Sequence, residues 1–458
     1  MMEFILFLSL LLPWLLGYSV VQLLFQKNPP PLTLQFALSY GLGMGILSQW
    51  ILCLGVAGIP YTENIIRLPL VLVMLLFLTI AWLRRSKYPH DPITIHDYKK
   101  AGIVEILLVS YVLFHIVVVL EKALQIPTCA WDAIATNGFI AKIIYFENSL
   151  RFFKNFPHNV YPLHVSFLQY WIALNLGTWH EQFINIIFPF YLVSFLVIQY
   201  HFISMFTNQR WALIGLAMLV SSPLLIYHAT VPYRDFTIAY YLSTTMMLLI
   251  LWQRFKNDAF LWLASAFAGV TTFVKLEGTV YLLFFIFICF YILRDRKDLS
   301  LKEKGKKFLK FFLPAFTICI FYHAYKFFAL EGYRQFRPGS TVDFNFLTIG
   351  VGFGGESWAR IPVIAEQFFA TLFLMGNWSL IWLIFCVSLL NYKMYKTAVE
   401  VRVLLLALFL FFTTLIFAFL FTQHFKWIAE GKDLLSRSIL QFFPLIPATI
   451  ALTHGPRK

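Results

Sequence analysis

The sequence predicts an all-α protein, a polytopic transmembrane bundle of about 13 spans with juxtamembrane helices in its first large outer loop. Of its 458 residues, 60% are hydrophobic and only 13% are charged, whereas soluble domains carry about 25% charged residues. Apolar runs of about 20 residues, the length at which a helix crosses a bilayer, recur along the whole chain. These two observations exclude a soluble protein and make the lipid bilayer a partner.

Thirteen apolar runs fit this length as candidate spans. In chain order they cover 4–25, 33–57, 67–83, 102–120, 183–205, 211–229, 236–253, 259–275, 278–293, 308–330, 366–390, 403–422 and 438–453. Glu3 replaces the basic start of a signal peptide, and no small-residue cleavage site follows, so we expect the first run to be a retained span.

Clusters of lysine and arginine set the orientation, because such clusters concentrate on the cytoplasmic side of a membrane protein. They are Arg84-Arg85 with Lys87, Lys99-Lys100, 294–307, 393–396 with Arg402, and Arg457-Lys458. With thirteen spans and an outer N-terminus, all of them fall on the cytoplasmic side. The net charge of +14 is therefore distributed over short loops, and we expect no nucleic-acid partner.

A further apolar piece, 161–176, is short and is interrupted by His164, Gln169 and Asn175. If it crossed the membrane, the basic clusters after it would face the side opposite to those before it. We therefore predict a juxtamembrane or re-entrant helix near the outer surface. The alternative is an ordinary span with a miscounted neighbour.

The polar segments outside the cytoplasmic loops all lie on one face in this topology. They are 121–182, 230–236, 275–278, 331–365 and 423–437. We therefore expect one integral-membrane unit, 1–458. Its parts are N-terminal spans (1–120), a catalytic outer loop (121–182), core spans (183–330), an outer loop that is a candidate acceptor lid (331–365) and C-terminal spans (366–458).

The stretch "CAWDAIATNGFIAKIIYFENS" follows the fourth span and places Asp132 after Trp131, with Lys142 ten residues later. Its apolar residues lie near helical spacing, which predicts a helix at the bilayer surface. Trp131 suits the membrane interface. Asp132 is either a carboxylate that caps this helix or a catalytic group, and local spacing alone favours the cap.

Two further outer-face segments carry charge beside apolar spans, where unpaired charge is costly. Arg234 and Asp235 adjoin in "VPYRDF", which is a polar turn or an anion site. Lys275 and Glu277 interrupt about 35 apolar residues, which favours a wet cavity or charged partners over a simple turn.

Arg437 opens the last span on the outer side, against the positive-inside bias. It is either a snorkelling arginine or a second cation for a phosphate. No metal site is predicted, because the five cysteines are scattered and the histidines form no metal-ligand pattern.

Taken in order, these motifs resemble the GT-C superfamily of integral-membrane glycosyltransferases, in particular bacterial members. The matching residues are Trp131-Asp132-Ala133 with Ala141-Lys142, His158 with Tyr161-Pro162-Leu163, Tyr233-Arg234-Asp235, the turn "FVKLEG" with Val274 where threonine is usual, and, loosely, "LLSRSILQFFP". The resemblance covers roughly residues 120–285, and the first three spans look like an N-terminal addition. It implies a helical bundle of the GT-C type in the inner (plasma) membrane, with its active site on the periplasmic or extracytoplasmic face.

The resemblance also implies inverting transfer of a sugar from a polyprenyl-phosphate donor to a glycan, lipid or protein acceptor. Asp132 would be the catalytic base, and the donor phosphate would bind to cations chosen among Lys275, Arg234, Arg437 and Lys142. Supporting roles fall to Asp235, Glu277, His158, Tyr161 and Trp131. The chain lacks the doubled acidic pair of some relatives, so a requirement for Mg²⁺ or Mn²⁺ stays open.

Two other classes remain as alternatives. A polysaccharide ligase or polymerase would use a lipid-linked oligosaccharide donor at a similar outer site. A transporter would show inverted repeats and polar residues near the midplane, whereas here the polar residues collect at one face.

Overall fold

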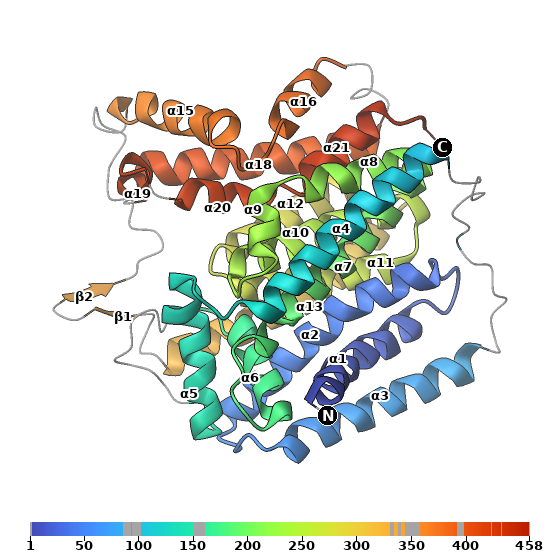
Figure 1. The fold of residues 1–458 in the computed structure, drawn as a ribbon. Helices are drawn as coiled ribbons and strands as arrows, with labels where there is room; N and C mark the ends of the chain where they lie inside the picture. Colours follow the sequence, from blue (N-terminus) through green and yellow to red (C-terminus); the bar gives the residue numbers. More distant parts are fainter. Residues whose placement is uncertain are drawn as a thin grey trace.

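The computed structural model describes residues 2–85, 93, 102–150, 161–329, 334–337, 340–343, 358–391, 398–422, 424–431 and 433–457. These residues are almost wholly helical, and the helices pack side by side as a bundle (Figure 1). One short antiparallel hairpin of β1 (Arg334–Arg337) and β2 (Ser340–Asp343) departs from the all-α prediction. It lies in the outer segment 331–365 of the predicted topology.

The first three helices form one flank of the bundle (Figure 1). They are α1 (Met2–Leu24), α2 (Leu32–Val56) and α3 (Glu63–Arg85). A Cβ at Gly17 would lie 1.9 Å from the Ser39 carbonyl oxygen, and one at Gly43 would lie 1.7 Å from the Pro13 carbonyl oxygen. Glycine therefore lets α1 and α2 cross in backbone contact, as small residues do between membrane helices.

The next segment holds a fourth long helix and three shorter helices in the region predicted as the first large outer loop. They are α4 (Ile103–Gln125), η1 (Ala133–Gly138), α5 (Phe139–Glu147) and α6 (His164–Leu176). The thirteen residues of α6 span about 20 Å, which is less than the hydrocarbon thickness of about 30 Å. All its residues from His164 to Leu174 are buried, and it packs on α1, α2 and α5. A short helix enclosed by protein favours the re-entrant form over a helix lying on the surface.

The core of the bundle is built from the following helices, which lie in the middle of Figure 1. They are η2 (Phe183–Asn185), α7 (Ile187–Phe206), α8 (Gln209–Val220), α9 (Pro223–His228), α10 (Arg234–Phe255), α11 (Asp258–Val274), α12 (Gly278–Asp295) and α13 (Leu301–Ala329). The most apolar stretch of α10 is 100% buried, so this helix lies inside the bundle, where it packs on α7, α9, α11, α12, α18 and α20.

The C-terminal helices form the opposite flank (Figure 1). They are α15 (Ile361–Phe369), η3 (Ala370–Leu374), α16 (Ile381–Ser388), α18 (Val399–Phe421), α19 (Phe425–Ala429), α20 (Leu434–Leu440) and α21 (Leu445–His454). The last two are bent by 50° at a short break that contains Pro444.

Nine helices in the described ranges are long and apolar enough to cross a membrane, or ten if α20 and α21 form one broken span. The chain is therefore a multi-pass membrane protein. Three predicted spans correspond to shorter or interrupted helices. The run 211–229 breaks into α8 and α9 before Pro223, 366–390 is interrupted around Gly376, and α11 has only 17 residues. The total of thirteen stays a prediction.

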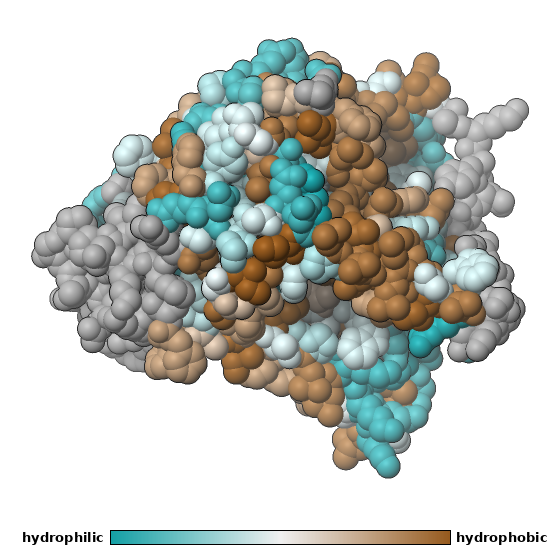
Figure 2. All heavy atoms as spheres, turned by 90° about the horizontal axis from the view of Figure 1, so that it is seen from below, coloured by the Kyte–Doolittle hydropathy of each residue, from teal (hydrophilic) through white to brown (hydrophobic). Residues whose placement is uncertain are grey.

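The outermost helices show which surfaces face lipid. In their most apolar stretches, only 17% of α3 and 11% of α4 is buried. Figure 2, seen from the side on which α3 lies in Figure 1, shows broad hydrophobic areas with hydrophilic residues in separate groups. Because exposed apolar surface of this extent is unfavourable in water, these helices indicate bilayer contact.

Candidate functional site

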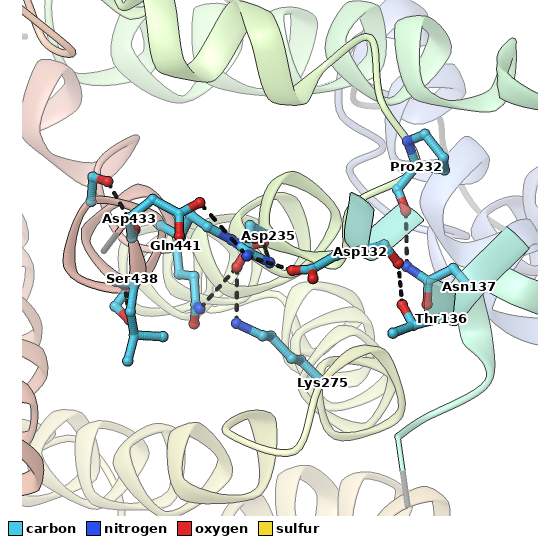
Figure 3. A network of polar contacts seen from close by, with 12 residues as sticks. Asp132, Thr136, Asn137, Pro232, Asp235, Lys275, Asp433, Ser438 and Gln441 are labelled. Atoms are coloured by element: carbon cyan, nitrogen blue, oxygen red, sulfur yellow. Dashed lines mark hydrogen bonds and ion pairs between the residues drawn. The ribbon is translucent and has the colours of Figure 1, made fainter. Parts of the chain in front are cut away.

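A buried carboxylate, Asp235, lies at the centre of the polar residues in Figure 3. It sits in the first turn of α10, where the helix dipole favours negative charge. Its Oδ1 accepts a hydrogen bond from Lys275 Nζ at 2.9 Å, and its Oδ2 accepts from Arg437 Nε and Nη2 at 3.0 and 2.9 Å. A buried carboxylate with two cationic partners is strongly held, since burial makes the loss of either partner costly.

Arg437, on α20, joins this centre to the outer loop. Its Nη1 donates to Asp132 Oδ2 at 2.5 Å, and its guanidinium lies 4.7 Å from the centre of the Tyr233 ring. Asp433, one turn earlier, lies 3.8 Å away. One arginine therefore bridges carboxylates that are 305 and 202 residues away in sequence. Burial raises the pKa of Tyr233 to about 12, and nearby Asp132 adds to the rise, so this phenol is neutral at physiological pH.

Lys275 reaches Asp235 from the break between α11 and α12. The break is tight, because a Cβ at Gly278 would lie 2.1 Å from the carbonyl oxygen of Thr271. Lys275 itself is extended, with φ −150° and ψ 152°, and its ammonium also lies 3.1 Å from Glu277. The charges that interrupt the apolar run therefore have charged partners, as their cost in such a place predicts.

Asp132 is held by Arg437 and does not cap a helix. It lies in the αR conformation ahead of η1, and its side chain makes no capping hydrogen bond, which rules out the N-cap interpretation. The π-helical turn η1 is fixed from both sides. Asn137 Nδ2 donates to the Pro232 carbonyl at 2.8 Å (Figure 3), and Ser166 Oγ donates to the Asn137 carbonyl at 3.0 Å. π-Helical turns often occur at functional sites.

We call Asp132, Asp235, Lys275, Glu277 and Arg437 the central ion-pair network. Its exposure is graded: the side chain of Asp235 is fully buried, that of Lys275 is 12% exposed, and that of Asp132 is 40% exposed. Three carboxylates against two cations give the network a net charge of minus one. Its outer carboxylates meet solvent while its cations are mostly enclosed.

Arg234, next to Asp235, makes no hydrogen bond or ion pair with this network within the described residues. Its guanidinium lies 4.4 Å from the centre of the Tyr161 ring, and the residue is only 6% exposed. Burial raises the pKa of the Tyr161 phenol, although Arg234 acts in the opposite direction, so the hydroxyl stays protonated. The adjacent Arg-Asp pair thus serves two different sides of the N-terminus of α10.

The structure does not bring every predicted residue to this place. Lys142 lies ten residues along the helix from Asp132, about 15 Å at the α-helical rise, and it faces Glu181 at 3.8 Å and the ring of Trp179 at 5.8 Å. Trp131 is 78% exposed, as expected of an interfacial residue. His158 falls outside the described residues.

Four residues near the site were missed by the sequence analysis. Gln441 Nε2 donates to Asp235 Oδ1 at 3.4 Å, and Tyr281 donates to Gln441 Oε1 at 2.5 Å. The ring of buried His228 lies 5.2 Å from that of Tyr233. Lys326, on α13, donates to the Tyr161 carbonyl at 3.1 Å. Of these, only Lys326 carried a usable signal, as a charge inside a predicted span.

No group of three or more histidine, cysteine, aspartate or glutamate side chains could hold a metal ion within the described part of the chain. Mg²⁺ needs only one carboxylate together with oxygens of a substrate phosphate. A divalent cation would therefore bind together with the substrate.

Comparisons with protein-family models, with curated protein sequences and with solved structures found no match to this chain.

Proposed function

We propose that this protein is an inverting glycosyltransferase of the GT-C type. It would transfer a sugar from a polyprenyl-phosphate donor to a glycan, lipid or protein acceptor on the extracytoplasmic face of the inner membrane. The observation that carries the proposal is the Asp132–Arg437–Asp235–Lys275 chain of ion pairs. Residues from four distant segments meet at one place, beside helices apolar enough to cross a membrane.

Asp132 is the proposed general base. Its carboxylate is partly exposed, so an acceptor hydroxyl can reach it, while the bond to Arg437 fixes its direction. As the hydroxyl oxygen attacks the anomeric carbon, its proton passes to Asp132. The bond between that carbon and the phosphate oxygen breaks, and its electron pair leaves with the phosphate. Direct attack inverts the anomeric centre, and a positioned base of this kind contributes about 10²- to 10⁴-fold to the rate.

The cations supply the second part of the chemistry. Negative charge grows on the leaving phosphate, and fixed cations in a poorly solvated site stabilise such charge without reorganising. Lys275, Arg437 and Arg234 are all largely enclosed, as this role requires. Asp235 and Glu277 orient Lys275, and Asp235 also orients Arg437. Exposed Trp131 would anchor the outer-loop helix in lipid headgroups.

The test is Asp132→Asn, assayed in membrane vesicles with a radiolabelled polyprenyl-phosphate sugar. We expect transfer to fall at least about 10²-fold with unchanged membrane expression, because the base is lost while the shape remains. Asp433→Asn is the matched control, since Asp433 also approaches Arg437 but is 71% exposed. Near-normal transfer by Asp132→Asn would remove Asp132 from the role.

A second arm of the assay replaces the monosaccharide donor with a lipid-linked oligosaccharide. Transfer of the larger group alone would instead identify a ligase or polymerase. Uptake of substrate into proteoliposomes without any covalent product would identify a transporter.

A further inference from the structure

The guanidinium of Arg234 is buried without a counter-charge in contact. Its Nε and Nη2 atoms are buried and have no hydrogen-bond partner in the part of the chain that the structure describes. Its guanidinium lies over the ring of Tyr161, and the carboxylates of Asp235 and Glu277 act on it without forming an ion pair. Arg437 is different, because all three of its guanidinium nitrogens donate to carboxylates, Nε and Nη2 to Asp235 and Nη1 to Asp132. Because an unpaired buried charge is costly, Arg234 is built to receive an anion.

The two free nitrogens belong to the same edge of the guanidinium. Elsewhere in this chain the same edge makes a two-point contact, where Arg296 Nε and Nη2 donate to the two carboxylate oxygens of Asp298 at 2.7 and 2.8 Å. Such parallel donors match two oxygens of one carboxylate or phosphate. The unpaired edge of Arg234 therefore matches an anion with two neighbouring oxygens.

A second enclosed cation contacts the same tyrosine. Lys326 is 1% exposed, and its ammonium contacts the backbone carbonyl of Tyr161, the residue whose ring contacts Arg234. The charges of Lys326 and Arg234 act on each other unfavourably. The first turn of α10 carries the positive end of the helix dipole. This positive potential disfavours the cation of Arg234 and favours a bound anion. The central ion-pair network, in contrast, is net negative.

We propose that Arg234 and Lys326 form the subsite that binds the donor phosphate, while the central ion-pair network positions the base and acts on the charge that develops during transfer. This inference rests on the proposed function and assigns roles within the same site. The ligand is a phosphate group carried by a lipid, and free phosphate shares its chemistry. Lys326 thus becomes a binding residue that belongs to none of the outer-face motifs.

The experiment measures binding without turnover, using purified full-length protein in detergent and intrinsic tryptophan fluorescence. The probes are farnesyl phosphate, uncharged farnesol and inorganic phosphate. We expect farnesyl phosphate to bind at least about tenfold more tightly than either other probe, which corresponds to about 1.4 kcal/mol. Arg234→Gln and Lys326→Gln should each weaken its binding at least about tenfold. Lys310→Gln, on the same helix but paired with Asp258, should bind as the wild type does.

Wild-type binding by Arg234→Gln or Lys326→Gln would overturn the assignment, as would equal binding of farnesol. Equal binding of inorganic phosphate would overturn the lipid source. If the glutamine variants do not fold, Lys326→Arg should bind within about threefold of wild type while Arg234→Lys stays weak, because an ammonium lacks the two-point edge. Asp132→Asn should bind farnesyl phosphate normally, so failure of the base and failure of the subsite are separate results.

Discussion

Two buried polar networks share helix α10 and differ in almost every other respect. The central ion-pair network lies at its first turn, and a neutral network begins one to two turns further along. We call the second the tyrosine network. Its members are Tyr40, Ser48, His164, Tyr191, Ser194, Tyr240 and Tyr241, all of which are buried.

The tyrosine network is closed. The hydroxyls of Tyr191 and Tyr241 lie 3.0 Å apart, Tyr241 donates to the Gly41 carbonyl at 2.7 Å, and His164 lies between Ser48 and Tyr191 at 2.7 and 3.1 Å. It joins α2, α6, α7 and α10 with neutral groups that satisfy one another. The ion-pair network is charged, graded in exposure and open at Asp132. A sealed neutral network specifies how helices pack, whereas an open charged one can exchange partners with a substrate.

The largest expected effect comes from Asp235→Ala. Lys275 and Arg437 would lose their shared buried carboxylate, which should cost about 3–5 kcal/mol of stability. Thermal unfolding in detergent measures this cost, with Asp433→Ala as the control for a carboxylate near Arg437. An unfolding temperature equal to that of the wild type would show that the network does not support the fold.

Lys275→Ala should act mainly on catalysis. Glu277 is about one-third exposed and Asp235 keeps Arg437, so we expect the protein to fold with a smaller loss of stability than Asp235→Ala causes. Loss of a charge-assisted hydrogen bond predicts about a tenfold or greater fall in kcat with donor. Lys307→Ala, which is paired with Asp258, is the control. A rise in KM alone would place the phosphate on Lys275, and unchanged kinetics would remove it from the site.

Tyr241→Phe should have the opposite profile. It removes one hydroxyl and leaves the Gly41 carbonyl and the Tyr191 hydroxyl short of a partner, for about 1–3 kcal/mol of stability. Sugar transfer by the folded protein should match the wild type. Thermal unfolding and the transfer assay on the same preparation test both halves. Lost transfer with intact stability would mean that the two networks are coupled along α10.

The smallest effect is expected for Lys142→Ala. A half-exposed ion pair with Glu181 contributes about 0–1 kcal/mol, and the residue is remote from Asp132. Transfer within about twofold of wild type, less than 0.5 kcal/mol in activation energy, is the expected result. A tenfold loss would return Lys142 to the list of donor-binding residues.

Sequence reasoning identified most of the ion-pair network because charge next to an apolar span is expensive and therefore conspicuous. Asp235, Lys275, Glu277 and Arg437 stood out in this way, whereas Asp132 was raised above a helix cap only by the family resemblance. The tyrosine network carried no such signal, because tyrosines among phenylalanines look like ordinary core. Gln441 was missed for the same reason, since a neutral amide inside a span is unremarkable.

The pairing of these residues could not be predicted, because it depends on how distant helices cross. Nothing local indicates that Arg437 reaches Asp132, 305 residues away. Lys142 shows the converse error. It lies ten residues from Asp132 in sequence, but the intervening helix separates the two side chains along its axis. Lys326 lies near the end of the predicted span 308–330, where a lysine can also reach the membrane interface, so its charge alone does not identify a buried site.

The direction of Asp132 depends on the number of residues in η1 as well as on the side chain of Asn137, which ties this turn to Pro232. Hydrogen bonds in a π-helix reach one residue further than in an α-helix, so Ala133–Gly138 holds extra length in the turn. Removing one residue there would restore α-helical spacing and rotate Asp132 by about 100° relative to α5. The carboxylate would then no longer face Arg437, although every charged side chain would still be present. The helical register of this turn therefore sets the direction of the Asp132 side chain, and a single deletion would break its ion pair with Arg437 without removing a charge.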